Sequence, residues 1–70
     1  MHWDQIEANW RYLQGKARQN WGRLTDDDLA HILGRREALV ARLKARYGLA
    51  DAHAEREIEA WSRSLTAFRA

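Results

Sequence analysis

The stretch Trp21-Gly22-Arg23-Leu24-Thr25-Asp26-Asp27-Asp28-Leu29 decides the fold, because it ends one helix and begins the next. Gly22 suits the left-handed conformation that commonly follows a helix end, and Thr25 suits the N-cap of a new helix. Asp28, three residues after Thr25, completes a capping box, and Leu24 and Leu29 occupy the positions of a hydrophobic staple. The stretch therefore predicts a tight turn between two helices.

The segment before this turn has the apolar spacing of one long helix, over about residues 4–21. Steps of three and four residues gather its large side chains within an arc of about 80°, and these are Trp3, Ile6, Trp10, Leu13, Ala17 and Trp21. Gly15 lies inside the segment at a cost of about 1 kcal/mol relative to alanine. Together with Ala8, Tyr12 and Gln19 it forms a second stripe, so we interpret Gly15 as a packing notch for a neighbouring helix, with a kink as the alternative.

Three further helices are predicted downstream, over about residues 26–33, 35–47 and 51–67. Gly34 is expected to end the first of them and Gly48 the second. Their apolar faces comprise, in order, Leu29, Ile32 and Leu33; Leu39, Val40, Leu43 and Tyr47; and Ala54, Ile58, Trp61, Leu65 and Phe68.

Two similar turns, Trp21-Gly22-Arg23-Leu24-Thr25 and Tyr47-Gly48-Leu49-Ala50, indicate two helical hairpins. The predicted fold is therefore one all-α domain of four helices over residues 1–70. Trp10 and Trp61 are predicted to anchor the core, and Trp21 to close the first helix. Trp3 is predicted to be partly exposed.

The composition limits the classes of protein to which the chain can belong. It has 70 residues with no cysteine and no proline, and its formal net charge is +2. Without cysteine there is neither a disulfide scaffold nor a thiolate zinc site. The first residues lack the basic and apolar regions of a signal peptide, and no apolar run approaches the ~20 residues needed to span a bilayer. We expect a soluble, monomeric, cytoplasmic protein without membrane insertion.

Patterns typical of catalysis and metal binding are weak. His2, His31 and His53 are isolated, His31 is expected to face solvent, and no serine lies in a recognisable nucleophile setting. The run Asp26-Asp27-Asp28 resembles a metal-ligand cluster, but successive side chains on a helix point about 100° apart, and capping and the helix dipole explain acids in a first turn. We therefore expect no enzymatic activity, catalytic residue, metal site or cofactor.

The third predicted helix carries a basic stripe. Arg35, Arg42 and Arg46 fall within about 40° of one another on the helical wheel, whereas Arg36 and Lys44 point elsewhere. Such a stripe is able to contact the phosphates of a nucleic acid or another polyanion. The alternative is a solvated face whose arginines cover the edge of the core and pair with acids of the fourth helix.

A third hypothesis is a protein-interaction module. Tryptophan and tyrosine dominate interface hot spots, and the aromatic stripes could form a partner-binding groove instead of a core. Trp3, near the chain end, is the residue most suited to contact such a partner.

These patterns resemble the CsbD-like family of small bacterial general-stress proteins, in particular its tryptophan-containing branch. The resemblance covers about residues 2–61 and rests on Trp3-Asp4-Gln5-Ile6-Glu7, Asn9-Trp10, Gly15-Lys16, the stretch from Trp21 to Leu29, Gly34-Arg35-Arg36, Leu39-Val40, Arg46-Tyr47-Gly48 and Trp61. Ala8 and Ala41 stand where the family is expected to have glycine, and arginine replaces much of its lysine.

The resemblance implies a four-helix fold of two hairpins packed crosswise, as in a SAM domain or a duplicated helix-hairpin-helix. It also implies expression under stress, and it brings no established biochemical activity, catalytic residue or cofactor. We therefore expect a non-enzymatic stress-response protein that acts through its surface.

Overall fold

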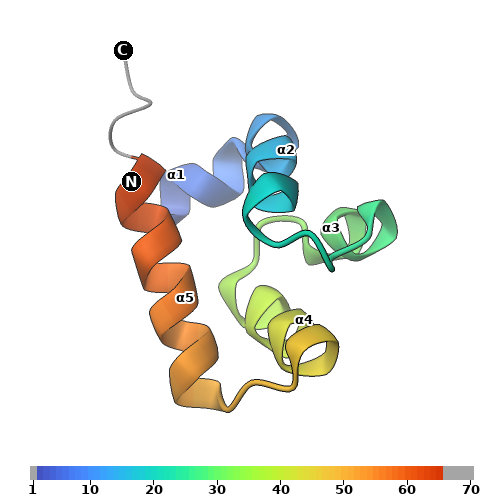
Figure 1. The fold of residues 1–70 in the computed structure, drawn as a ribbon. Coiled ribbons are helices and arrows are strands. Elements are labelled where there is room, and N and C mark those ends of the chain that lie inside the picture. Colours follow the sequence, from blue (N-terminus) through green and yellow to red (C-terminus); the bar gives the residue numbers. More distant parts are fainter. Residues whose placement is uncertain (1, 66–70) are drawn as a thin grey trace.

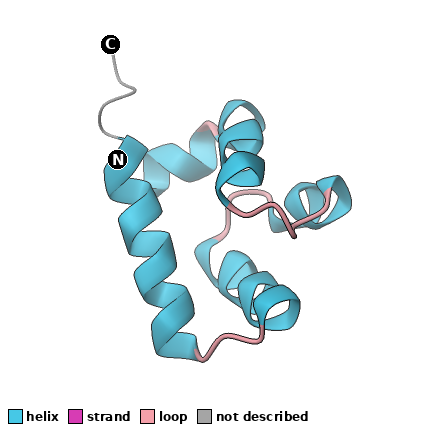
Figure 2. Cartoon of the chain, in the orientation of Figure 1, coloured by secondary structure: helices cyan, strands magenta, loops and turns pink. Residues whose placement is uncertain are grey.

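Five helices make up the part of the chain that the structure, a computed structural model, describes, namely residues 2–65 (Figures 1 and 2). They are α1 (Trp3–Ala8), α2 (Trp10–Asn20), α3 (Asp26–Ile32), α4 (Arg36–Tyr47) and α5 (Asp51–Ser64), and no strand occurs within these residues. Each helix contacts the next one in the chain, and α5 runs along one side of the molecule from the turn after α4 to the neighbourhood of α1 (Figure 1). The predicted all-α class is confirmed, the predicted number of four helices is wrong, and the crossed packing of two hairpins stays a prediction.

The additional helix arises because the predicted helix over residues 4–21 is interrupted at Asn9. This residue has φ −110° and ψ 22°, and its backbone N–H and side-chain Nδ2 donate to the carbonyl of Gln5 at 3.0 and 2.8 Å. The carbonyl of Asn9 in turn accepts from the N–H groups of Tyr12 and Leu13, in the first turn of α2. Because asparagine competes for nearby backbone groups, it favours helix ends over helix interiors. The apolar stripe gave no sign of this break, since it continues on both sides of it.

Gly15 is neither a packing notch nor a kink. It lies exposed inside α2, and a Cβ atom added to it would have no neighbour within 4 Å. Tyr12, on the same stripe, is 61% exposed. Within residues 2–65 no helix packs closely at this glycine, so the interpretation of Gly15 as a notch is wrong.

The turn between α2 and α3 contains the predicted capping box. Thr25 Oγ1 accepts from the N–H of Asp28 at 3.0 Å, and Asp28 Oδ2 accepts from the N–H of Thr25 at 3.1 Å. Trp21 follows the last residue of α2 and is 3% exposed, as expected for the residue that closes this helix. Gly22 does not adopt a positive φ, because the N–H of Leu24 bonds to the Trp21 carbonyl at 3.1 Å and closes the turn without it.

The left-handed conformation occurs instead at the end of α3. Leu33 has a φ of 53° and Gly34 a φ of 78°, so the helix stops before Gly34 as predicted. Leu33 is 57% exposed, although the apolar pattern places it in the core. The buried arc of α3 runs over about 100° from Asp28 through Ile32 to Leu29, and Leu33 lies about 40° beyond it. The prediction of an inward Leu33 is therefore wrong.

The last two helices follow the predicted pattern. After α4, Gly48 has a φ of 65° and donates its N–H to the Lys44 carbonyl at 2.9 Å. The last helix, α5, ends at Ser64, while Phe68 and the predicted final helical residues 66 and 67 lie outside the described residues. With 14 residues α5 is the longest helix in residues 2–65, and none of the helices there is both long and apolar enough to cross a bilayer.

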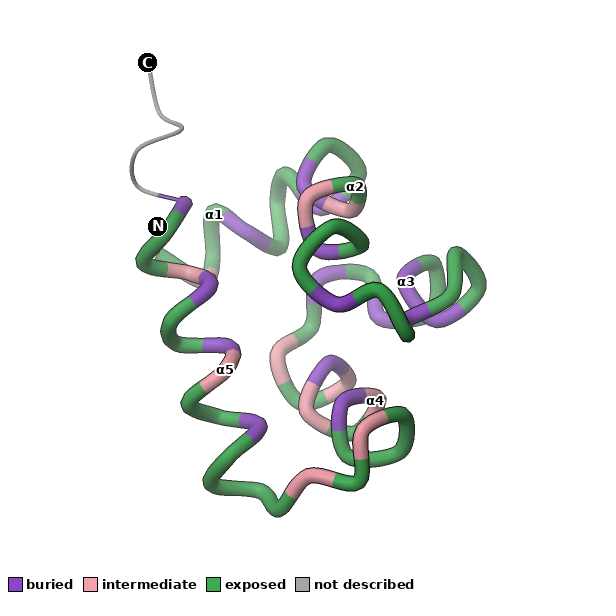
Figure 3. Tube along the Cα trace, in the orientation of Figure 1, coloured by how far each residue is buried: buried purple, intermediate pink, exposed green. Residues whose placement is uncertain are grey.

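One apolar core joins the five helices, and Figure 3 shows its buried positions turned toward the space between α5 and the other elements. Each helix contributes at least one residue that is at most 1% exposed, including Ile6, Leu13, Leu29, Leu39 and Ile58. The aliphatic part of the predicted core is thus confirmed for these positions.

The four tryptophans form a cluster around Trp61. Its ring centroid lies 6.3 Å from those of Trp3 and Trp10 and 5.2 Å from that of Trp21, in edge-on or tilted geometries that aromatic pairs favour. Trp10 and Trp61 are each 5% exposed, which confirms both as core anchors, whereas Trp3 is only partly buried. Through Trp61, α5 therefore contacts α1, the start of α2 and the end of α2 with a single side chain.

Candidate functional site

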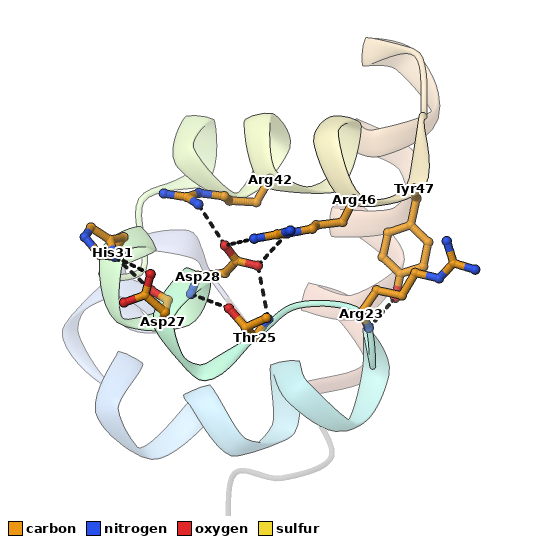
Figure 4. A network of polar contacts seen from close by, with 8 residues as sticks. All are labelled: Arg23, Thr25, Asp27, Asp28, His31, Arg42, Arg46 and Tyr47. Carbon is orange, nitrogen blue, oxygen red and sulfur yellow. Dashed lines mark hydrogen bonds and ion pairs between the residues drawn. The ribbon is translucent and has the colours of Figure 1, made fainter.

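The most concentrated polar feature of the described residues is a buried carboxylate, that of Asp28, beneath two arginines of α4 (Figure 4). Asp28 Oδ1 accepts from Nη1 of Arg42 at 2.7 Å and from Nη2 of Arg46 at 2.9 Å. Asp28 Oδ2 accepts from Nε of Arg46 at 2.8 Å and from the backbone N–H of Thr25 at 3.1 Å. The carboxylate therefore accepts four hydrogen bonds while being 0% exposed.

The local sequence explains how these groups meet. Asp28 lies in the first turn of α3 on the same side as Ile32, so the helix that buries Ile32 also buries the carboxylate. Arg42 and Arg46 are four residues apart and therefore share one face of α4. The packing of α3 against α4 brings the two faces together. The guanidinium of Arg46 then binds both carboxylate oxygens as a fork, whereas that of Arg42 donates a single hydrogen bond.

These contacts favour the ionised forms of both Asp28 and Arg46. The hydrogen bonds from Arg46 hold the pKa of Asp28 well below its usual range, although burial opposes this by raising it. The same contact with Asp28 raises the pKa of Arg46. Because neither group changes its charge near neutral pH, this pair does not have the proton affinity of a general acid or base.

Two of the three arginines of the predicted basic stripe contact Asp28, and Arg35 does not. Arg42 and Arg46 converge on Asp28 and keep 36% and 44% of their side-chain surfaces exposed. Arg35 lies seven residues before Arg42, about 10 Å along the helix axis, and is exposed with no ion pair to residues 2–65. Arg42 and Arg46 thus pair with an acid of α3. The alternative interpretation of the stripe, a solvated face, predicted that they would pair with acids of the last helix.

Acidic residues of α5 form ion pairs with Arg36 and Lys44, the two basic residues predicted to point away from the stripe of Arg35, Arg42 and Arg46. Arg36 Nη2 lies 2.5 Å from Glu55 Oε1 and 3.7 Å from Glu59 Oε1. Lys44 Nζ lies 2.6 Å from Asp51 Oδ1. These pairs are partly exposed, and each is worth at most about 1 kcal/mol.

The three aspartates do not converge on a common point. Asp26 pairs with Arg18, and Asp27 lies beside His31, whose Nδ1 is 2.9 Å from the Asp27 carbonyl and whose side chain is exposed as predicted. Asp28 points inward to the arginines (Figure 4). Within residues 2–65 no group of three or more histidine, cysteine or acidic side chains is placed to hold a metal ion.

The inference from sequence missed the second role of Asp28. The Thr-x-x-Asp spacing predicts the cap and is confirmed, but one oxygen of the carboxylate remains available after capping. The position of Asp28 on the helix could have indicated this role, because Asp28 lies four residues before the buried Ile32 and therefore on the same face. A buried charge is normally paired with an opposite charge, and Arg42 and Arg46 supply that charge here.

Comparison with known proteins assigns the chain to a family. A family model described as CsbD-like matches residues 4–56. The chain belongs to the CsbD-like family. The matched region of this CsbD-like chain contains the complete Asp28 cluster and ends before Trp61, the centre of the tryptophan cluster.

Individual relatives are similar over most of their lengths. UPF0337 protein ECA0631 of Pectobacterium atrosepticum is 48% identical over 61 residues, which cover 87% of this chain and 88% of the relative. UPF0337 protein NE2439 of Nitrosomonas europaea is 40% identical over 69 residues, covering 99% of this chain and 73% of the relative. UPF0337 protein YjbJ of Escherichia coli K12 is 41% identical over 61 residues, covering 87% and 88%. The resemblance found in the sequence is thereby confirmed.

Proposed function

We propose that the protein is a non-enzymatic stress-response protein, a cytoplasmic monomer of one domain that acts by binding through its surface. The observation that carries this proposal is that the buried polar side chains of the protein form hydrogen bonds with other groups of the same chain. Within residues 2–65 every buried side-chain nitrogen or oxygen has a hydrogen-bond partner. The two groups with displaced pKa values, Asp28 and Arg46, are engaged with each other. In an active site such groups are instead directed toward a substrate.

The family supports the physiological part of the proposal. Membership of the CsbD-like family, together with the stress-linked expression that the resemblance implies, indicates when such a protein is needed. It leaves the molecular activity to be determined from the surface.

The proposal is tested by deleting the gene in the organism that encodes it. We expect expression to rise, and the deletion strain to lose viability, under at least one of osmotic, acid, oxidative or stationary-phase stress. Complementation with the wild type should restore viability. Unchanged expression together with an unchanged survival curve under all four stresses would contradict the proposal.

Polyanion binding through Arg35, Arg42 and Arg46 is the second candidate activity. It is supported by the position of Asp28, which is 0% exposed beneath guanidinium groups that remain 36% and 44% exposed. A phosphate is therefore able to reach both guanidinium groups, although the exposed carboxylate of Asp27 lies near Arg46. The charge of Asp28 offsets about one of the three positive charges. We therefore expect about two phosphate contacts and a slope of log K against log salt of about −2.

The test is a titration at low salt with duplex DNA, RNA and anionic vesicles, followed by amide NMR. Shifts should concentrate in residues 35–46, and Arg35→Gln should weaken binding. Arg56→Gln is the matched control, because Arg56 is also exposed and makes no ion pair with residues 2–65 but lies on α5. An absence of shifts in residues 35–46, or an equal effect of the two variants, would reject this activity.

Protein binding through Trp3 is the third candidate, and the contacts of Trp3 give it less support. Its Nε1 donates to the Gly34 carbonyl at 2.9 Å, its ring packs on Trp61, and the guanidinium of Arg36 lies 5.8 Å from its ring centroid. Capture of partners from stressed cells by wild type and Trp3→Ala tests it. Loss of a partner at an unchanged melting temperature supports an interface, whereas unfolding of the variant assigns Trp3 to the core.

A further inference from the structure

A small cavity of about 230 Å³ lies where the ends of α2 and α4 meet the first half of α5. Its volume is below the ~300–1,000 Å³ of sites for drug-sized ligands, so it suits a ligand of only a few heavy atoms. Its walls combine aromatic, apolar and acidic side chains, and they are formed by Asn20, Trp21, Tyr47, Leu49, His53 and Glu57.

The Glu57 carboxylate gives this cavity a negative charge, and neither lysine nor arginine is among the residues that line it. Among the four acids of α5, Glu57 is the one without a lysine or arginine partner in the described part of the chain. Its Oε1 accepts from Trp21 Nε1 at 3.3 Å, its Oε2 lies 3.7 Å from His53 Nε2, and its side chain is 43% exposed. Neither contact neutralises the carboxylate while the imidazole is uncharged.

Two helix ends add to this potential. Helix α2 ends at Asn20 and helix α4 ends at Tyr47, and both residues line the cavity. The C-terminus of each of these two helices carries about half a negative charge, which favours a nearby cation. The first turn of α5, which contains His53, carries about half a positive charge and opposes this effect in part.

The aromatic walls select which kind of cation fits. Tyr47 already accepts one cation, because the guanidinium of Arg23 lies 5.6 Å from its ring centroid (Figure 4). Tyr47 lines the cavity, whereas Arg23 does not. Trp21, which is 3% exposed, is the second aromatic residue of the lining. Aromatic rings attract weakly hydrated cations such as quaternary ammonium groups.

We propose that this cavity binds the methylated ammonium group of a small organic cation. The methyl groups contact Trp21, Tyr47 and Leu49, and the positive charge faces the Glu57 carboxylate. An alkali metal ion finds a single carboxylate in the lining, and a primary ammonium is strongly hydrated. The proposal goes beyond surface binding under stress and does not depend on it.

Choline and its neutral carbon isostere, dimethylbutanol, provide the direct test. Each is titrated into the full-length protein at mildly alkaline pH, where an ordinary imidazole is uncharged, with sodium chloride at equal ionic strength as the salt control. The readout is the NMR signal of the Trp21 indole N–H and of the amides around Tyr47. We expect saturable shifts with choline, with a dissociation constant in the millimolar range, and no saturation with the isostere or the salt.

Variants locate the binding to this cavity. Glu57→Gln keeps an acceptor for Trp21 but removes the charge, and it should weaken choline binding by at least about fivefold. Glu59→Gln, on the same helix but outside the cavity, is the matched control and should leave the affinity unchanged. If Glu57→Gln does not fold, Tyr47→Leu replaces it with the same expectation. Absent shifts, equal response to choline and dimethylbutanol, or unchanged affinity in the cavity variant would each overturn the proposal.

Discussion

Replacing Gly34 by alanine tests the packing of α1 against the end of α3. A Cβ atom at Gly34 would lie 2.8 Å from the Cα of Glu7 and 3.1 Å from the Cβ of Trp10. The first contact is with backbone, so it is relieved only if α1 moves. Gly48 is the matched control, because its φ of 65° is close to the 78° of Gly34, but a Cβ there meets nothing within 4 Å.

The magnitudes follow from these two environments. An alanine in the left-handed region costs about 1–2 kcal/mol, and the reduced freedom of the unfolded chain returns about 0.4–1 kcal/mol. We therefore expect Gly48→Ala to lower the free energy of unfolding by about 0.5–1 kcal/mol. Gly34→Ala adds an overpacking cost of about 1–3 kcal/mol, for a total of about 1.5–4 kcal/mol. A chain of this length has about 4–10 kcal/mol of stability, so the second variant loses a large share of it.

Equilibrium unfolding in urea, followed by circular dichroism and tryptophan fluorescence, measures both variants. The urea midpoint should fall much further for Gly34→Ala than for Gly48→Ala, with an unchanged m-value if both remain two-state. In a thermal melt each 1 kcal/mol corresponds to about 4–8 °C. If the two variants differ by less than about 0.5 kcal/mol, the close approach of α1 to Gly34 is refuted.

Four other substitutions have distinct expected outcomes. Gly15→Ala should raise the free energy of unfolding by about 0.5–1 kcal/mol, since Gly15 lies exposed within α2 with no neighbour to obstruct a methyl group; a loss of stability in the same urea assay would contradict this. Trp10→Ala should cost about 3–5 kcal/mol, and a variant that melts within a degree or two of wild type would show that Trp10 is outside the core. Thr25→Ala should cost about 1 kcal/mol through loss of the cap, which an unchanged melting temperature would disprove. Asp28→Asn should cost about 2 kcal/mol at neutral pH. Because the folded-state pKa of Asp28 is lowered, its stabilisation is present above the unfolded value of about 3.9 and is lost as the pH falls from there; acid titrations should therefore be shallower for Asp28→Asn, and identical curves would argue against the ion pair.

Much of the secondary structure was predictable because its signals are local. The box formed by Thr25 and Asp28 needs only a hydroxyl and a carboxylate three residues apart, and Gly48 needs only the freedom to adopt a positive φ after the last helical turn. The break at Asn9 also has a local signal, in a residue that favours helix ends, but the uninterrupted apolar spacing outweighed it. Periodicity reports which side of a helix is apolar and is insensitive to a bend that keeps the same side buried.

The candidate site was predictable in part. The stripe of Arg35, Arg42 and Arg46 follows from helical spacing, yet spacing along one helix does not identify the charge on another. Asp28 and Arg42 are 14 residues apart, and their contact exists because α3 packs against α4. The cavity beside Glu57 likewise joins residues from three helices and had no sequence signature.

The sequence by itself determined the all-α class, the turns at Thr25 and Gly48, the core tryptophans and the family. Each of these depends on residues close together along the chain or on a repeated apolar spacing. Only the tertiary structure decided the exposure of Gly15 and Leu33, the burial of Asp28 under two arginines, and the convergence of three tryptophan rings on Trp61. These outcomes depend on which helix faces which, and that choice is made by the whole core at once, since apolar burial is non-directional and close packing admits few arrangements.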